Sequence, residues 1–311
     1  MSTVTQRDES LGSVLVALAA NTTIAVAKGT AALLTGSPAL LAETLHTVAD
    51  TGNEVLLYIA IRRSRHPADA SHPFGYGPER YYWALLAAIG MFVVGGVVSV
   101  WDGVHALAHP AELTAFWAGV TVLVIALVLD GVSRTVALRQ LRRQAGQRGL
   151  TVRAFVRETP DPTALTVYFE DTVDVLGAAL ALVALVLHHV TGSGVPDAVG
   201  SIIIGALLCF LAARLTTRNR QLLTNQSVPD RYVRRLEARL EADAAIHAVI
   251  RLEAVYLGPG EVLVAADVEM AEQLSGAEVA AVLTRARAEL VAEIPAIARL
   301  YLTPVARPAV D

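Results

Sequence analysis

Two short groups of ionisable residues lie inside otherwise apolar stretches of this sequence. The first group contains His46 and Asp50, which are four residues apart and so leave one helix face about one turn apart. The second group contains Glu170, Asp171 and Asp174, in which positions 170/174 and 171/174 have the same relation. Two helices that each present such a pair can close four ligands around one cation.

The residue types bear on which cation would bind. One imidazole with carboxylates suits tetrahedral Zn²⁺, whereas an all-oxygen set favours harder ions such as Mn²⁺. The alternatives are a hydrogen-bonded packing role for His46 and a favourable interaction of the second group with a helix N-terminus. The sequence favours the shared cation site, because a turn-spaced pair occurs on each of two helices and an unpaired carboxylate in hydrocarbon is costly.

The composition of the chain is that of a membrane protein, with lipid as its surroundings. Apolar types make up 54% of the 311 residues and charged types only 17%, whereas a soluble globular chain carries about 25% charged residues. The net charge of −4 provides no basic footprint, so we expect no nucleic-acid partner. The single Cys209 cannot form an intrachain disulfide.

Six apolar segments must position the two groups. Each is long enough for the ~20 helical residues that cross a bilayer, and they cover residues 11–34, 40–61, 81–107, 113–138, 164–190 and 196–215. Arginines gather in the loops after the second, fourth and sixth segments, while loops 36–39, 109–112 and 191–197 contain no Lys or Arg. The positive-inside rule then places both termini in the cytoplasm. We expect a multi-pass protein of the cell inner membrane.

Residues 1–220 are therefore predicted to form a six-helix transmembrane domain, and residues 221–311 a cytoplasmic α+β domain. In the second domain the pattern predicts a helix over 232–242, strands over 248–256 and 262–270, a helix over 276–294 capped by Ser275, and a strand over 299–305. Two helices on one face of a three-stranded sheet are expected. This domain carries no cysteine, paired histidine or glycine-rich phosphate loop, so no chemistry of its own is indicated.

Two further patterns inside the apolar segments indicate structure rather than chemistry. Asp130 is expected to pair with Arg134, one turn later on the same helix. Small residues recur every four positions in the third and sixth segments, where they permit close packing of helices. They are Gly95, Ser99 and Gly103, and Ser201, Gly205, Cys209 and Ala213.

Several local sequences, spread over much of the chain, resemble the cation diffusion facilitator family, and the resemblance as a whole extends over nearly the whole chain. Residues 40–50, LLAETLHTVAD, are similar to the family's second-span motif, with His46 and Asp50 at its metal positions. Residues 66–77, HPADASHPFGYG, resemble the signature that follows that span. Residues 196–205 and 222–228 are similar to the sixth-span opening and to its exit into the soluble domain. The segment 161–171 resembles the zinc-transporter-nine-like branch.

The resemblance implies a fold of six transmembrane helices followed by a ferredoxin-like soluble domain, and a symmetric homodimer joined through that domain. The implied activity is export of a divalent cation, Zn²⁺ first, in exchange for protons by alternating access. The ion is then a transported substrate, and neither a cofactor nor an enzyme activity is expected. Two alternatives stay open: a transporter for Mn²⁺, Fe²⁺ or Co²⁺, and a non-transporting regulator that binds metal or a partner protein.

The resemblance also implies which residues bind metal. In the family's fifth span, His or Asp is followed after three residues by Asp, and a glycine comes about six positions later. Counting back from Gly177 puts Asp171 at the second ligand position and Val167, which cannot bind metal, at the first. Either Glu170 or Asp174 then supplies the missing oxygen. The predicted ligands are His46, Asp50, Asp171, and one of Glu170 and Asp174.

Two further metal positions of the family are altered in this chain. Some relatives bind a second metal in the loop after the second span. Asp69 and His72 match those positions, but Tyr76 replaces a histidine. The soluble domain also lacks, around residues 301–304, the His and Asp ligands that some relatives carry near the last strand.

Overall fold

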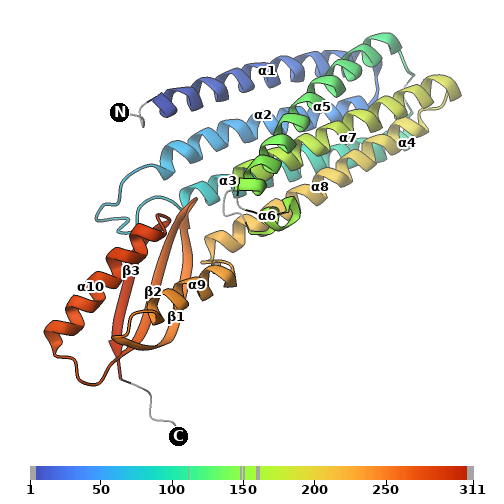
Figure 1. The fold of residues 1–311 in the computed structure, drawn as a ribbon. Helices are drawn as coiled ribbons and strands as arrows, with labels where there is room; N and C mark the ends of the chain where they lie inside the picture. The colour runs from blue at the N-terminus through green and yellow to red at the C-terminus, as the bar shows by residue number, and fades with distance from the viewer. Residues whose placement is uncertain (1–4, 111, 148, 150, 159–161, 307–311) are drawn as a thin grey trace, which may run out of the picture. The chain divides into compact units, whose positions relative to one another are not determined.

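The computed structural model describes residues 5–110, 112–147, 149, 151–158 and 162–306, and Figure 1 shows their arrangement. Its elements run from a helical first part into a mixed second part. They are α1 (Thr5–Thr35), α2 (Pro38–Ser64), α3 (Glu79–Gly90), the π-helix η1 (Met91–Val97), α4 (Val98–Ala108), α5 (Phe116–Gln147), α6 (Val152–Glu158), α7 (Pro162–Thr191), α8 (Val195–Leu223), α9 (Asp230–Glu241), β1 (Ile246–Gly258), β2 (Glu261–Met270), α10 (Gly276–Glu293) and β3 (Ile297–Val305).

The chain divides into two compact units. The first contains residues 1–62 and 82–220, and the second contains residues 63–81 and 221–311. One division comes after residue 220, and the loop 63–81 groups with the second unit. The reason is packing: Tyr81 is fully buried in the hydrophobic core of that unit, and a Cβ added at Gly77 would collide with the carbonyl oxygen of Leu257.

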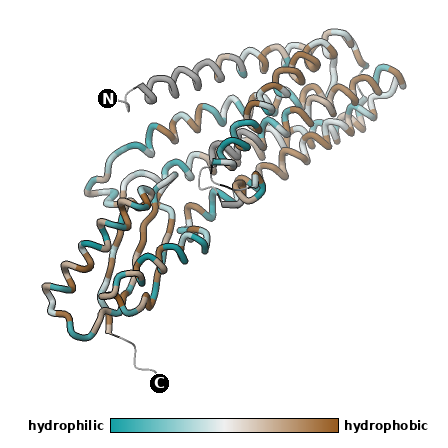
Figure 2. The backbone as a smooth tube through the Cα atoms, viewed as in Figure 1, coloured by the Kyte–Doolittle hydropathy of each residue, from teal (hydrophilic) through white to brown (hydrophobic). Residues whose placement is uncertain are grey.

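Long helices occupy all six of the predicted apolar segments, the third being built from α3, η1 and α4. Among the residues described, four regions are long and apolar enough to cross a membrane: 79–108, 116–147, 169–191 and 195–223. The apolar character of these helices is visible in Figure 2. α2 is not among the four, and it carries the carboxylates Glu43, Asp50 and Glu54. The protein is thus a multi-pass membrane protein, while the count of six crossings stays a prediction.

Small residues let α8 pack closely against η1 and α4, as their spacing predicts. A Cβ added at Gly205 would lie 2.8 Å from the carbonyl oxygen of Gly96, so only glycine fits there without a shift. Nearby, the Ser201 hydroxyl donates to the carbonyl oxygen of Ser99 at 2.9 Å. Such contacts matter in a bilayer, where no hydrophobic force draws one apolar helix to another.

The second unit contains the predicted order of helix, strand, strand, helix and strand. In its sheet β1 pairs antiparallel with β2, and β2 pairs parallel with β3. Ser275 caps α10 as expected: its hydroxyl accepts from the backbone N–H of Glu278, whose carboxylate accepts in return from the N–H of Ser275. This reciprocal pair satisfies donors that a helix N-terminus leaves free.

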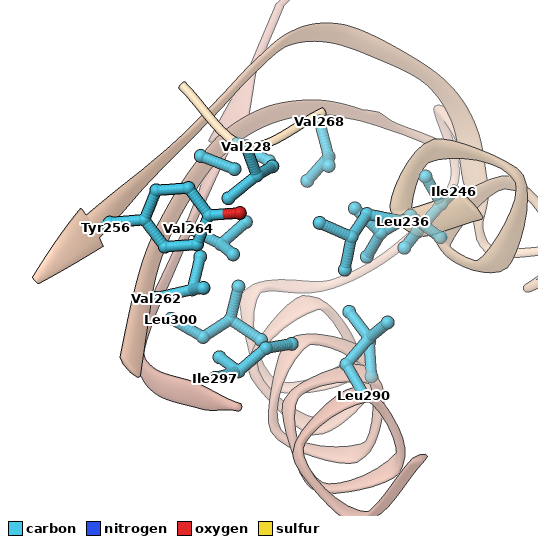
Figure 3. Packing of buried hydrophobic residues seen from close by; sticks show 14 of the residues in the cluster. Val228, Leu236, Ile246, Tyr256, Val262, Val264, Val268, Leu290, Ile297 and Leu300 are labelled. Atoms are coloured by element: carbon cyan, nitrogen blue, oxygen red, sulfur yellow. The ribbon is translucent and has the colours of Figure 1, made fainter. Parts of the chain in front are cut away.

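The core of the second unit lies between one face of the sheet and the two helices. Alternate residues of β2 are buried, as a half-covered strand requires. Leu236 of α9 and Leu290 of α10 converge on the same sheet face as Val264 and Leu300 (Figure 3). The two helices therefore cover one face of the sheet, as predicted.

The adjacent residues Leu290 and Val291 provide a matched test of this core. Leu290 is 2% exposed and Val291 is 40% exposed. We expect Leu290→Ala to lower the free energy of unfolding of the second unit by about 2–5 kcal/mol, because it leaves a cavity. Val291→Ala should cost less than about 1 kcal/mol. Hydrogen exchange of the strand amides, measured on the full chain in detergent, would report both values, and equal effects would contradict this packing.

Candidate metal centre

Three of the predicted site residues meet inside the first unit. Nδ1 of His46 lies 3.2 Å from an oxygen of Asp50, and Nε2 lies 3.0 Å from an oxygen of Asp174. One potential ligand atom from each residue lies within 4.8 Å of the other two. His46 is fully buried. An imidazole is thus placed between carboxylates of α2 and α7, in a cluster small enough to hold a single cation.

Helix geometry explains how these atoms come together. Asp50 follows His46 by four residues on α2, so both side chains leave the same face. Neither ring nitrogen of His46 makes a hydrogen bond, and neither does Oδ1 of Asp50. The two ring nitrogens face carboxylate oxygens instead, and because buried charges are paired or coordinate metals, a cation among these carboxylates would balance them.

Glu170 lies beside the cluster rather than in it. It is one turn before Asp174 on α7, and its carboxylate accepts a hydrogen bond from the Asn53 amide at 2.7 Å. Asn53 follows Asp50 by three residues, so the same stripe of α2 that carries the ligands also holds Glu170 in place. Glu170 is therefore a candidate fourth donor, oriented by an amide from the opposite helix.

Asp171 lies apart from the cluster. Both of its oxygens accept from the Ser133 hydroxyl of α5 at 3.1 Å. Because one residue rotates a helix by about 100°, positions 170 and 174 face α2 while 171 turns toward α5. Counting back from Gly177 favours Asp171 as a ligand, but the side chain that lies next to His46 is that of Asp174. The side chain of Val167, at the other glycine-based position, lies outside those that the structure describes.

The expected pair of Asp130 and Arg134 does not form among the described residues. Arg134 instead donates from Nε to the Thr172 hydroxyl on α7 at 3.2 Å, and Oδ2 of Asp130 is buried without a hydrogen-bond partner. That prediction is wrong because α7 packs against α5 and offers Arg134 an acceptor across the helix contact.

The sequence reasoning missed a buried ion pair next to the cluster. Nζ of Lys28 on α1 donates to Oε1 of Glu43 and to the Thr47 hydroxyl, each at 2.9 Å. Lys28 is 1% exposed and Glu43 is 0% exposed. A signal was available, because a lysine and a glutamate within apolar segments must find opposite charges.

Hydrogen bonds within the loop after α2 hold the carboxylate of Asp69. Asp69 accepts from the hydroxyl of Ser71 at 2.7 Å and from that of Tyr76 at 2.8 Å, and the His72 ring stacks on Tyr76. The Ser71 hydroxyl, followed by that of Tyr76, lowers the pKa of Asp69 well below its usual value. Nδ1 of His72 lies 4.0 Å from Oδ1 of Asp69. The sequence left a second metal site at Asp69 and His72 open.

Comparison with known proteins identifies the class of protein. Residues 14–224 match the family model described as the cation efflux transmembrane domain. The match covers more than half of the chain, which therefore belongs to this cation efflux family, also called the cation diffusion facilitators.

Curated relatives place the chain in the zinc-transporter-nine-like branch. It is 33% identical over 256 residues to the proton-coupled zinc antiporter SLC30A9, mitochondrial, of Mus musculus and equally to that of Homo sapiens, covering 82% of this chain and 45% of each relative. It is 31% identical over 238 residues to metal tolerance protein C4 of Arabidopsis thaliana, covering 76% of this chain and 52% of the relative. The chain thus spans about half the length of these relatives.

One solved structure also matches part of the chain. The nickel form of a variant MamM C-terminal domain is 18% identical and covers 26% of this chain and 100% of that domain, at a TM-score of 0.24. A score at that level does not define a shared fold, and the architecture of the second unit follows from its own strands and helices.

Asparagine substitutions test which carboxylate of α7 binds metal. We expect Asp174→Asn to weaken Zn²⁺ binding more than about 100-fold, since even residues that only orient ligands are worth ~10–100-fold. Asp171→Asn should change it less than about threefold, because the side chain contacts Ser133 instead of His46. Competition with a chromophoric chelator on detergent-purified protein would measure both. A strong effect at Asp171 with none at Asp174 would restore the glycine-based alignment.

Proposed function

We propose that this protein exchanges Zn²⁺ for protons by alternating access, with the ion carried between α2 and α7. The observation that carries the proposal is the buried cluster of His46, Asp50 and Asp174 in a member of the cation efflux family. Glu170 is the proposed fourth donor. Four ligands of this kind, one imidazole and three carboxylates, suit the tetrahedral preference of Zn²⁺.

Proton exchange follows from the chemistry of the ligands. An imidazole nitrogen binds metal only when it is unprotonated, so metal and proton compete for the same atom. An ion that arrives from one side of the membrane would displace the bound proton to that side. A proton from the opposite side would then replace the ion when the ion is released. The names of the relatives support this assignment, since the mouse and human proteins are named proton-coupled zinc antiporters.

The proposed orientation rests on the arginine-rich loops. By the positive-inside rule these loops favour a cytoplasmic second unit and cytoplasmic termini, so export would carry Zn²⁺ out of the cytoplasm. We propose the cell inner membrane as the location and a homodimer joined through the second unit as the assembly. Mass measurement in detergent checks the assembly.

The carboxylate-rich donor set favours one alternative cargo. With three oxygen donors of four, the site could also carry Mn²⁺, an ion that suits carboxylate ligands. His46 would then be the residue that shifts preference toward Zn²⁺, because imidazole nitrogen is the one donor that is not an oxygen.

Vesicle transport of a His46 series tests the function and its coupling. In proteoliposomes with an imposed pH difference and a trapped zinc indicator, we expect the natural protein to accumulate Zn²⁺ against its gradient. His46→Asn should keep some binding through its amide oxygen but lose most accumulation driven by the pH difference, since an amide does not exchange protons in this range. His46→Asp should retain transport and relax the preference toward Mn²⁺.

Asp171→Asn serves as the matched control, since it removes a neighbouring carboxylate that lies outside the cluster. Full proton-driven accumulation by His46→Asn would move the coupling to the α7 carboxylates. Zinc binding without any transport by the natural protein would favour a non-transporting regulator.

A further inference from the structure

The buried ion pair of Lys28 and Glu43 lies against the proposed carrier site but takes no part in it. Glu43 precedes His46 by three residues on α2, and Thr47, the second acceptor of the ammonium, follows His46 directly. The ammonium thus bonds to the helix turn from which His46 projects. Both members of the pair are removed from solvent, so the surroundings screen their charges weakly.

The other oxygen of Glu43 faces α7. Oε2 makes no hydrogen bond, and a Cβ added at Gly177 would collide with it. Gly177 follows Asp174 by three residues, so this carboxylate contacts α7 one turn beyond the ligand. Glu43 is therefore held between α1, α2 and α7, one helical turn from the cluster, with a free oxygen pointing to the ligand-bearing helix.

The charges around the ammonium are mostly negative. After Glu43, the carboxylates whose charges reach Lys28 are Asp130 and Asp174. Without Lys28, the ion would face Glu43 and Asp130 in addition to its own ligands. Such a site would bind a divalent cation tightly and release it slowly. A carrier must bind its ion and also release it.

We propose that Lys28 sets the affinity of the carrier site: its ammonium is a built-in cation that neutralises Glu43, keeps it from acting as a further metal ligand, and opposes the transported ion enough to allow release. This inference rests on the proposed function. It makes Lys28 an affinity-determining residue, and Glu43 the group through which it acts.

The plainer reading of the pair is architectural. A buried ion pair can fix α1 against α2, and removing one partner would then destabilise the bundle and weaken binding at the site. The two readings differ in sign. Loss of the ammonium tightens metal binding if Lys28 tunes affinity, and loosens or leaves it unchanged if Lys28 only joins helices.

A double-mutant cycle on the full chain in detergent separates them, with Zn²⁺ alone as the probe. We expect Lys28→Met to tighten Zn²⁺ binding at least about tenfold and to slow turnover in proteoliposomes, because an opposing charge is lost. Glu43→Gln should weaken binding at least about tenfold, since the ammonium is then unneutralised. The double variant should return to within about threefold of the natural protein, because charge is balanced again.

Two variants serve as controls. Lys28→Arg keeps the charge and should keep the natural affinity. Asn21→Leu removes another polar side chain of α1, one that donates to Glu54 at 2.8 Å, and should leave the affinity unchanged.

Weaker or unchanged binding in Lys28→Met overturns the proposal. If that variant does not fold, Glu43→Gln decides together with its thermal stability: weaker binding at an unchanged melting temperature supports the proposal, whereas an unchanged affinity, or a loss of affinity that follows a loss of stability, overturns it. His46→Ala in the same assay keeps the two claims apart. If it does not affect Zn²⁺ binding, the carrier site itself is wrong; if it abolishes binding while the Lys28 and Glu43 variants behave as the natural protein, only this inference fails.

Discussion

The first unit depends on one constraint: charge among apolar helices must be balanced nearby. The pair of Lys28 and Glu43 meets it permanently, with one ammonium against one carboxylate. The cluster around His46 does not, because two carboxylates face one imidazole, and even a protonated ring supplies a single positive charge. A divalent cation removes that excess. We therefore propose the cluster around His46, and not the pair of Lys28 and Glu43, as the place of the transported ion.

Packing decides whether such groups can meet at all. Between apolar helices in lipid there is no hydrophobic attraction, so contact depends on close backbone approach at small residues. Gly177 leaves room for Glu43 against α7, and Gly205 lets α8 approach the backbone of Gly96. The glycines affect the charged groups indirectly. They let the helices approach closely enough for side chains of α1, α2 and α7 to lie in one buried region.

The second unit could be predicted almost completely from sequence, and the reason is local periodicity. Alternation over 248–256 and 262–270 marks strands that the structure extends by only a few residues, and Ser275 with Glu278 marks the start of α10. The placement of the loop 63–81 could not be predicted. Its membership of the second unit depends on Tyr81 entering a core built from residues far along the chain.

For the candidate site, the sequence could predict only which residues lie one helical turn apart. Positions 170/174 and 171/174 are both one turn apart, so spacing alone cannot tell which pair faces α2. Rotation of α7 decides it, and that rotation depends on neighbours: Asn53 holds Glu170 on one side, while Ser133 holds Asp171 on the other. The α2 half of the site needed no such knowledge, because His46 and Asp50 share one helix face whatever packs against it. A ligand pair within one helix is thus readable from sequence, whereas the choice among adjacent carboxylates on a second helix requires the packed structure.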